Sequence, residues 1–251
     1  MNSINSAYLL VFHGSRNPQY SLNLSRLADL VREQFWHTTN SIPLVEVAAL
    51  EFADVPLSKN IIRFAHKAIA YNYQKVVIIP VFLSAGVHVR EDIPQEVAEA
   101  TEKLGDSIAI SITDYISQSP QLTALIEQKF ASVAADCGRI LLAHGSRLSQ
   151  RNVSSEQLAK EVCAINAYWT VKPDLSSAVQ LLANQNLSSI VIVPFFLFLG
   201  RITDAIALQV AELQTQFPQT KLLLQPPLGA TTELARLIFA HEQSPLEARS
   251  N

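Results

Sequence analysis

The chain contains 251 residues, of which 49% are hydrophobic and 16% are charged. This composition excludes a disordered or low-complexity protein and suits one large folded domain or two smaller ones. The formal net charge of −3 provides no basic excess to bind a phosphate backbone, so no nucleic-acid partner is expected.

Strands and helices are predicted to alternate through the first half of the chain. The predicted strands are short apolar runs, as in a buried parallel sheet, at residues 8–12, 44–50, 76–83 and 107–113. Between them, apolar residues recur at helical spacing. The third helix is expected to begin near Asp92, with Pro94 in its first turn, and the last to span residues 121–133. This alternation predicts a parallel sheet with helices on both faces.

The second half is predicted to repeat this plan. Its expected strands are residues 140–143, 190–198 and 222–225, and its helices include residues 155–167, 204–216 and 232–241. The sequence His13-Gly-Ser-Arg16 returns as His144-Gly-Ser-Arg147, 131 residues later (144 − 13), and the segment 80–86 returns at 194–200. These repeats indicate two tandem, duplicated, doubly wound α/β domains at residues 1–135 and 136–251. We expect them to pack closely about a pseudo-twofold axis.

Three side chains of the first half follow the ends of predicted strands. His13 follows the first strand, Glu51 the second and His88 the third. Because ligands of open α/β sheets bind at the carboxyl ends of the strands, these side chains should meet at one edge. Two imidazoles and a carboxylate suit a divalent transition metal, and they equally suit proton transfer near neutral pH. Their spacing does not separate the two interpretations.

Each of these residues also has a simpler structural explanation. The His-Gly-Ser turn could cap the next helix through the Ser15 oxygen, and His88 could be an exposed loop residue. Two histidines at equivalent strand ends, with Glu51 between them, favour the functional interpretation. Three other histidines are assigned no role: His37, His66 and His241.

Several signatures of other protein classes are missing. The sequence has no Gly-x-Ser-x-Gly elbow, no Walker A loop and no Gly-x-Gly-x-x-Gly fingerprint. Cys137 and Cys163 lack a CxxC partner, so each is expected to be a small core residue in a reducing compartment. The longest apolar run, residues 190–199, is about half a membrane span. We therefore expect a cytoplasmic protein with no membrane partner.

The residues around these motifs resemble the sirohydrochlorin chelatases, which are class II, ATP-independent enzymes that insert cobalt or iron into a tetrapyrrole. The resemblance rests on Leu-Val-Phe-His13-Gly-Ser-Arg-Asn-Pro, on Ala-Leu-Glu51 and on Pro-Val-Phe-Leu-Ser-Ala-Gly-Val-His88-Val-Arg-Glu-Asp-Ile-Pro. It extends over both halves, as in the long, internally duplicated form. It implies that His13 and His88 handle the metal and accept protons, with Glu51 as a third catalytic and metal-binding participant.

This assignment agrees with the chemistry of metal insertion, which strips water from the ion and removes two pyrrole protons. Imidazoles can hold the ion and accept protons near pH 7, and a carboxylate can orient an imidazole. The carboxylates of sirohydrochlorin require local positive charge, which arginine supplies well, although a surface ion pair is the alternative for each arginine. The expected substrate-binding residues are Ser15, Arg16, Gly86, Arg90, Arg147 and Arg201.

The second half departs from the pattern. His144 is retained, but the counterpart of His88 falls within residues 200–203, where there is no histidine, and that of Glu51 falls near Tyr168 or Trp169. One working site in the first half is therefore expected, with the second half closing the cleft and contacting the substrate. His144 is interpreted as a remnant that caps a helix.

The sequence thus predicts a sirohydrochlorin chelatase for sirohaem or cobalamin synthesis, acting as a monomer that contains an internal pseudo-dimer. Fe²⁺ is slightly favoured over Co²⁺ as the metal substrate, and no tightly bound cofactor is expected. A non-catalytic tetrapyrrole or metal carrier on the same fold is the alternative, which the proton-removing set of His13, Glu51 and His88 argues against. A hydrolase with His13 as base is disfavoured because no nucleophile motif accompanies it.

Overall fold

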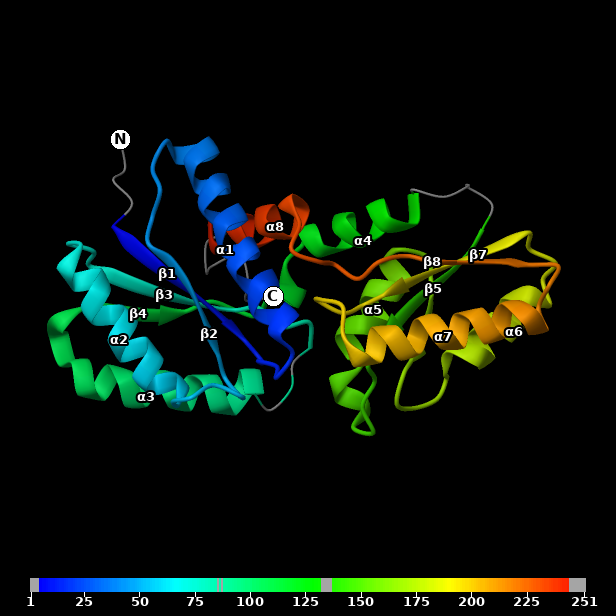
Figure 1. Cartoon of the computed structure of the whole chain (residues 1–251), viewed down its shortest axis with the longest axis horizontal. Helices are drawn as coiled ribbons and strands as arrows, with labels where there is room; N and C mark the ends of the chain where they lie inside the picture. The colour runs from blue at the N-terminus through cyan, green and yellow to red at the C-terminus, as the bar shows by residue number, and fades with distance from the viewer. Residues whose placement is uncertain (1–4, 85, 87, 132–136, 244–251) are drawn as a thin grey trace. The chain divides into compact units, whose positions relative to one another are not determined.

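The computed structural model describes residues 5–84, 86, 88–131 and 137–243, with the side chains of His88 and Gln243 outside the description. It contains two four-stranded parallel sheets, with strand orders β2-β1-β3-β4 and β6-β5-β7-β8 (Figure 1). The second order repeats the first with every strand number raised by four. This confirms the predicted pair of tandem α/β domains.

In the first sheet, β1 is one of two apolar inner strands, and it positions the candidate site. Its neighbours pair with it in parallel, with Phe12 beside Ala49 on one side and Val11 beside Pro80 on the other. Both neighbouring strands therefore end close to the end of β1. The strands are β1 (Ser6–Phe12), β2 (Val45–Ala49), β3 (Lys75–Pro80) and β4 (Ala109–Ile112).

Helices cover both faces of this sheet because side chains of β1 alternate between two cores. Leu9 and Val11 pack with apolar residues of α2 and α3, whereas Tyr8 packs on Phe35 of α1 with ring centroids 4.6 Å apart. Phe35 also meets Phe239 of α8 edge to face, at 4.8 Å and 89°. The helices are α1 (Pro18–Thr39), α2 (Leu57–Ala70), α3 (Ile93–Leu104) and α8 (Thr232–Gln243).

The second sheet is built in the same way. Ile140 and Leu142 of its central strand pack with apolar residues of α6 and α7. The strands are β5 (Gly138–Ala143), β6 (Ile165–Tyr168), β7 (Ser189–Pro194) and β8 (Lys221–Leu224). The helices are α4 (Gln121–Ala131), α5 (Val153–Glu161), α6 (Leu175–Ala183) and α7 (Arg201–Gln216).

Packing divides the chain at different places from the sequence repeat. One compact unit comprises Met1–Ser119 and Ala230–Asn251, and the other comprises Pro120–Gly229. The last helix within the described residues, α8, thus packs in the unit of the first sheet, on α1, and α4 packs in the unit of the second. We still propose that the duplicated repeats are residues 1–135 and 136–251. These bounds come from the repeated sequence, whereas the two compact units are defined by packing.

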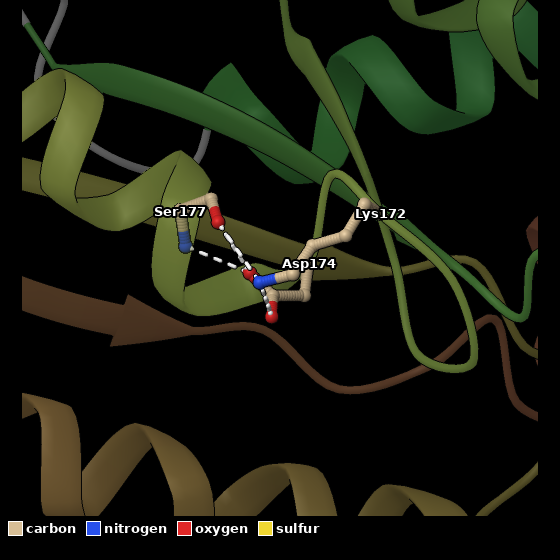
Figure 2. Close-up of polar contacts among 3 residues, drawn as sticks. All are labelled: Lys172, Asp174 and Ser177. Carbon is tan, nitrogen blue, oxygen red and sulfur yellow. Dashed lines mark hydrogen bonds and ion pairs between the residues drawn. The ribbon is translucent and has the colours of Figure 1, made fainter.

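Two sequence-based boundaries in the second half were wrong. The helix expected at 155–167 is α5 followed by β6, and the turn between them contains Cys163 with a positive φ of 52°. The strand expected at 190–198 ends at Pro194. Helix α6 was not among the helices expected from the sequence. It begins after an Asp174 cap: the Asp174 carboxylate accepts hydrogen bonds from the backbone and hydroxyl of Ser177 and pairs with Lys172 (Figure 2).

No helix within the described residues is both long and apolar enough to cross a membrane.

Candidate functional site

The candidate site is built on backbone hydrogen bonds that continue beyond the ends of β1 and β2. Leu50 donates its N–H to the carbonyl oxygen of Phe12, and Glu51 donates to that of His13, both at 2.8 Å. The segments that follow the two strands therefore run side by side. Through this ladder the structure brings His13 and Glu51 together, although they are far apart in the sequence.

Gly14 makes this close approach possible. Its φ is +100°, a conformation that residues with a Cβ rarely adopt. A Cβ at this position would lie only 2.0 Å from the carbonyl oxygen of Glu51. The glycine is thus required both by the turn and by the neighbouring backbone.

The two functional side chains approach each other at the surface. His13 Nε2 lies 3.9 Å from Glu51 Oε2, and the side chains are 44% and 41% exposed. At this exposure an ion pair contributes only about 0–1 kcal/mol, so it does not explain the arrangement by stability. Two ligands that each lie about 2.1 Å from one ion can be at most about 4.2 Å apart. The observed separation is within that limit, so the pair can share a metal ion.

Phe52, the residue after Glu51, was not predicted to belong to the site. Its φ of 57° is left-handed, which costs a residue with a side chain about 1–2 kcal/mol. The ring lies 6.2 Å from the His13 imidazole, with 26° between the planes. The Arg16 guanidinium carbon lies 5.3 Å from the same ring centroid, within cation–π range. No residue-type pattern around position 52 indicates this backbone conformation.

Residues at the start of α1 fix the turn that carries His13. The Ser15 hydroxyl oxygen accepts a hydrogen bond from the Asn17 N–H at 3.1 Å, and the Asn17 side chain caps the helix by accepting from Gln19. The cap is therefore Asn17 and not Ser15, the candidate from the sequence. Burial raises the pKa of Tyr20, while a hydrogen bond from the Gly14 backbone acts in the opposite direction. Tyr20, which sequence reasoning missed, therefore ties α1 to this turn.

The segment after β3 begins a π-helical turn at His88–Asp92, which leads into α3. The carbonyl oxygen of Gly86 accepts hydrogen bonds from Val89 and Arg90, at 3.2 and 3.3 Å. The Arg90 side chain is exposed. The side chain of His88 lies outside the described part of the structure, so its role stays a prediction. π-Helical turns occur frequently at functional sites.

Among the side chains that the structure describes, no group of three or more histidines, cysteines or acids is arranged to hold a metal. His13 and Glu51 are thus the described part of the predicted ligand set, and His88 is its predicted third member.

The equivalent edge of the second sheet has the same backbone but different side chains. Trp169 donates to the carbonyl oxygen of Ala143 at 2.9 Å, and Thr170 donates to that of His144 at 3.0 Å. The counterpart of Glu51 is therefore Thr170, one residue beyond the position expected from the sequence. A carboxylate is replaced there by a hydroxyl.

The counterpart of His88 follows from the same comparison. Phe195 donates to Leu142 as Val81 donates to Val11, both at 2.8 Å, which fixes an offset of 114 residues (195 − 81). This offset places Ile202 opposite His88 and Asp204 opposite Arg90 in the alignment of the repeats. The second half has thus lost the predicted metal ligand and reversed the charge of a predicted carboxylate-binding residue.

His144 and the two remaining arginines lie in the second unit. The His144 Nδ1–H donates to the carbonyl oxygen of Gly145 at 3.0 Å. The helical segments that follow are a 3-10 turn at Ser149–Arg151, preceded by Leu148, and α5, preceded by Asn152, so the expectation that His144 caps a helix was wrong. Arg147 and Arg201 are both exposed, and Arg201 is the first residue of α7.

Comparison with known proteins gives both a family and a fold. A family model named CbiX matches residues 7–133 and 138–244. The sirohydrochlorin cobaltochelatase of Methanocaldococcus jannaschii is 35% identical over 89 residues, which cover 36% of this chain and 56% of that protein. The chain therefore spans little more than half the length of this curated relative.

Two solved structures share the fold over nearly the whole chain. SirB from Bacillus subtilis with Fe³⁺ superposes with a TM-score of 0.74 at 18% identity, covering 95% of this chain and 94% of SirB. The sirohydrochlorin chelatase SirB from Bacillus subtilis subspecies spizizenii in complex with cobalt gives a TM-score of 0.67 at 18% identity, covering 94% and 93%. At this identity the likeness establishes the fold.

Proposed function

Because the chain belongs to the CbiX family, whose model matches both of its halves, we propose that it is a sirohydrochlorin chelatase. The observation that carries this proposal is the pairing of His13 with Glu51, whose side chains lie 3.9 Å apart on backbone segments joined by a hydrogen bond. A divalent ion and a metal-free tetrapyrrole are the substrates, and the products are the metallated ring and two protons.

The first task of the site is to receive the ion. The side chains of His13 and Glu51 are 44% and 41% exposed, which is enough for solvent and substrate to reach both groups. An imidazole and a carboxylate can replace water ligands of a divalent transition metal. His88 is proposed as the third ligand on the basis of the sequence. With few protein ligands, the ion can still be transferred to the four nitrogens of the tetrapyrrole.

The second task is to remove the two pyrrole protons. We propose His13 as the acceptor of one proton, because imidazole is a common proton acceptor in enzymes. Glu51 can stabilise the resulting imidazolium or carry the proton away, because its carboxylate oxygen is within 4 Å of Nε2. His88 is the proposed acceptor of the other proton. Each proton leaves a pyrrole nitrogen as that nitrogen binds the metal.

The third task is to bind the carboxylates of the substrate. Arg16 follows the His13 turn, and Arg90 lies in the π-helical turn after β3. Both are exposed, and guanidinium groups bind carboxylates through paired hydrogen bonds. We propose Ser15, Gly86, Arg147 and Arg201 as further substrate-binding residues.

One chain carries both copies of the repeat, so we propose that the protein acts as a monomer. We also propose that it acts in the cytoplasm.

Fe²⁺ and Co²⁺ are the two candidate metals, since imidazole and carboxylate ligands accept both. The curated relative is named a cobaltochelatase, and the two SirB structures contain Fe³⁺ and cobalt. We propose Fe²⁺ as the slightly favoured metal, with Co²⁺ as the alternative.

The direct test mixes the purified chain with sirohydrochlorin and either ion under anaerobic conditions and follows the absorbance change. The proposal expects a rate above the spontaneous one with at least one of the two ions. Binding of sirohydrochlorin without acceleration by either ion would instead support the carrier function and contradict catalysis.

A further inference from the structure

Phe52 combines two properties that the fold alone does not require. Its backbone is left-handed at a φ of 57°, which is unusual for a bulky side chain. Its side chain is nevertheless 54% exposed, so burial in a core does not account for this conformation. Strained residues of this kind are held by their surroundings and cluster at functional sites.

The contacts of the ring point to a specific role. The ring lies near the imidazole of His13 at a small interplanar angle of 26°, and the Arg16 guanidinium carbon is 5.3 Å from its centroid. One aromatic side chain therefore contacts both the proposed proton acceptor and a proposed carboxylate-binding group. The backbone of the preceding residue, Glu51, is in turn bonded to His13.

The second half provides an internal comparison. Because Thr170 matches Glu51, the residue that matches Phe52 is Val171. Val171 is not among the residues of positive φ in the described chain. The strained aromatic therefore occurs on the side that has the carboxylate and is missing on the side that has lost it.

We propose that Phe52 is a positioning residue for the chelatase reaction: its ring holds the Arg16 guanidinium beside His13. A substrate carboxylate bound by Arg16 is then placed so that a pyrrole nitrogen faces the imidazole. This inference rests on the proposed function. The positioning role requires the electron-rich face of an aromatic ring, because an aliphatic side chain of similar size attracts a guanidinium far less.

Three variants separate this role from a structural one. Phe52→Leu keeps the bulk but removes the aromatic face, and Phe52→Tyr keeps the face. Phe52→Gly removes the ring and also relieves the backbone, since glycine adopts positive φ without strain. Tyr71→Leu is the matched control, because Tyr71 is also an exposed aromatic residue, at 63%. It lies between the end of α2 and the start of β3 at Lys75, near the amino end of that strand and therefore away from the candidate site.

The readouts are the steady-state constants, the Kd for metal-free sirohydrochlorin from fluorescence titration, and Tm. Phe52→Leu and Phe52→Gly should each raise KM and Kd about three- to fivefold, as expected for loss of an exposed cation–π contact. Phe52→Tyr and Tyr71→Leu should match wild type. Phe52→Gly should have a Tm equal to or above that of wild type, which a merely structural role would not produce.

A double-mutant cycle with Arg16→Gln completes the test. Phe52→Leu should add little to the effect of Arg16→Gln, because Arg16→Gln already removes the contact between the guanidinium and the Phe52 ring. If the wild-type chain is active but Phe52→Leu and Phe52→Gly bind and react like wild type, the positioning role is wrong and the proposed function stands. If the wild-type chain neither binds sirohydrochlorin nor accelerates metal insertion, the proposed function is wrong and this inference with it.

Discussion

Glu51 is joined to His13 through its backbone as well as its side chain: its N–H donates to the His13 carbonyl oxygen at 2.8 Å, and the carboxylate lies 3.9 Å from the imidazole. The backbone hydrogen bond sets the relative positions of the two Cα atoms, and the exposed side chains can change rotamer without breaking it. A displacement of either turn would therefore move both groups at once. The following predictions test this arrangement.

Gly14→Ala should damage the site through the backbone. The new Cβ would be 2.0 Å from the Glu51 carbonyl oxygen at a φ of +100°, so the turn must move. We expect destabilisation of at least about 1 kcal/mol in urea unfolding. We also expect a loss of metal insertion of about tenfold or more, because small displacements of catalytic groups are costly.

Gly86→Ala is the control for stability. Among the described residues, apart from Gly86 itself and its chain neighbours, no atom lies within 4 Å of the position of a Cβ, so its urea midpoint should stay close to that of wild type. Equal stability losses in Gly86→Ala and Gly14→Ala would contradict the steric explanation.

Thr170→Val tests whether the equivalent turn of the second half is structural. The Thr170 hydroxyl donates to the carbonyl oxygens of His144 and Gly145, at 3.0 and 3.1 Å. Loss of these exposed bonds should cost about 0.5–1 kcal/mol of unfolding free energy. The rate of metal insertion should stay that of wild type, because this turn has no carboxylate at the position of Glu51. A large loss of rate with unchanged stability would show that the second turn takes part in the reaction.

Asp174→Ala should weaken the second unit in a pH-dependent way. Hydrogen bonds from Lys172 and then from Ser177 lower the pKa of Asp174 from 3.8 to about 2. The cap therefore contributes its full stability above about pH 4 and loses it as the pH falls through about 2. At pH 7 the variant should be about 1 kcal/mol less stable.

Thermal unfolding of Asp174→Ala and wild type between pH 2 and pH 7 measures this difference. The gap in Tm should narrow as the pH is lowered. A gap that stays constant down to pH 2 would mean that the carboxylate charge does not matter to the cap.

Much of the architecture could be predicted because it depends on local patterns. The apolar runs of β1 and β3 and the two His-Gly-Ser-Arg turns indicated a duplicated parallel fold. His13 and Glu51 could be placed at one edge because parallel strands end together. The boundary between α5 and β6 was missed because the apolar pattern continues through Cys163, whose positive φ breaks the helix.

Other features depend on packing that the sequence does not reveal. Phe52 has no residue-type signal for a left-handed backbone, and Tyr20 is linked to the site by its hydrogen bond with the Gly14 backbone. Thr170 could be matched to Glu51 only from the hydrogen bond to His144. The place of α8 is set by the contact of Phe239 with Phe35, residues from opposite ends of the chain.

The most direct test of the central claim compares His13→Ala with His144→Ala in the anaerobic metal-insertion assay. The two substitutions remove the same side chain from equivalent turns of the two halves, so effects on folding should be similar. We predict that His13→Ala lowers the rate by about a hundredfold or more, as expected for loss of a proton acceptor, and that His144→Ala stays close to wild type. Equal losses in both variants, or an unchanged rate in His13→Ala, would contradict a single working site in the first half.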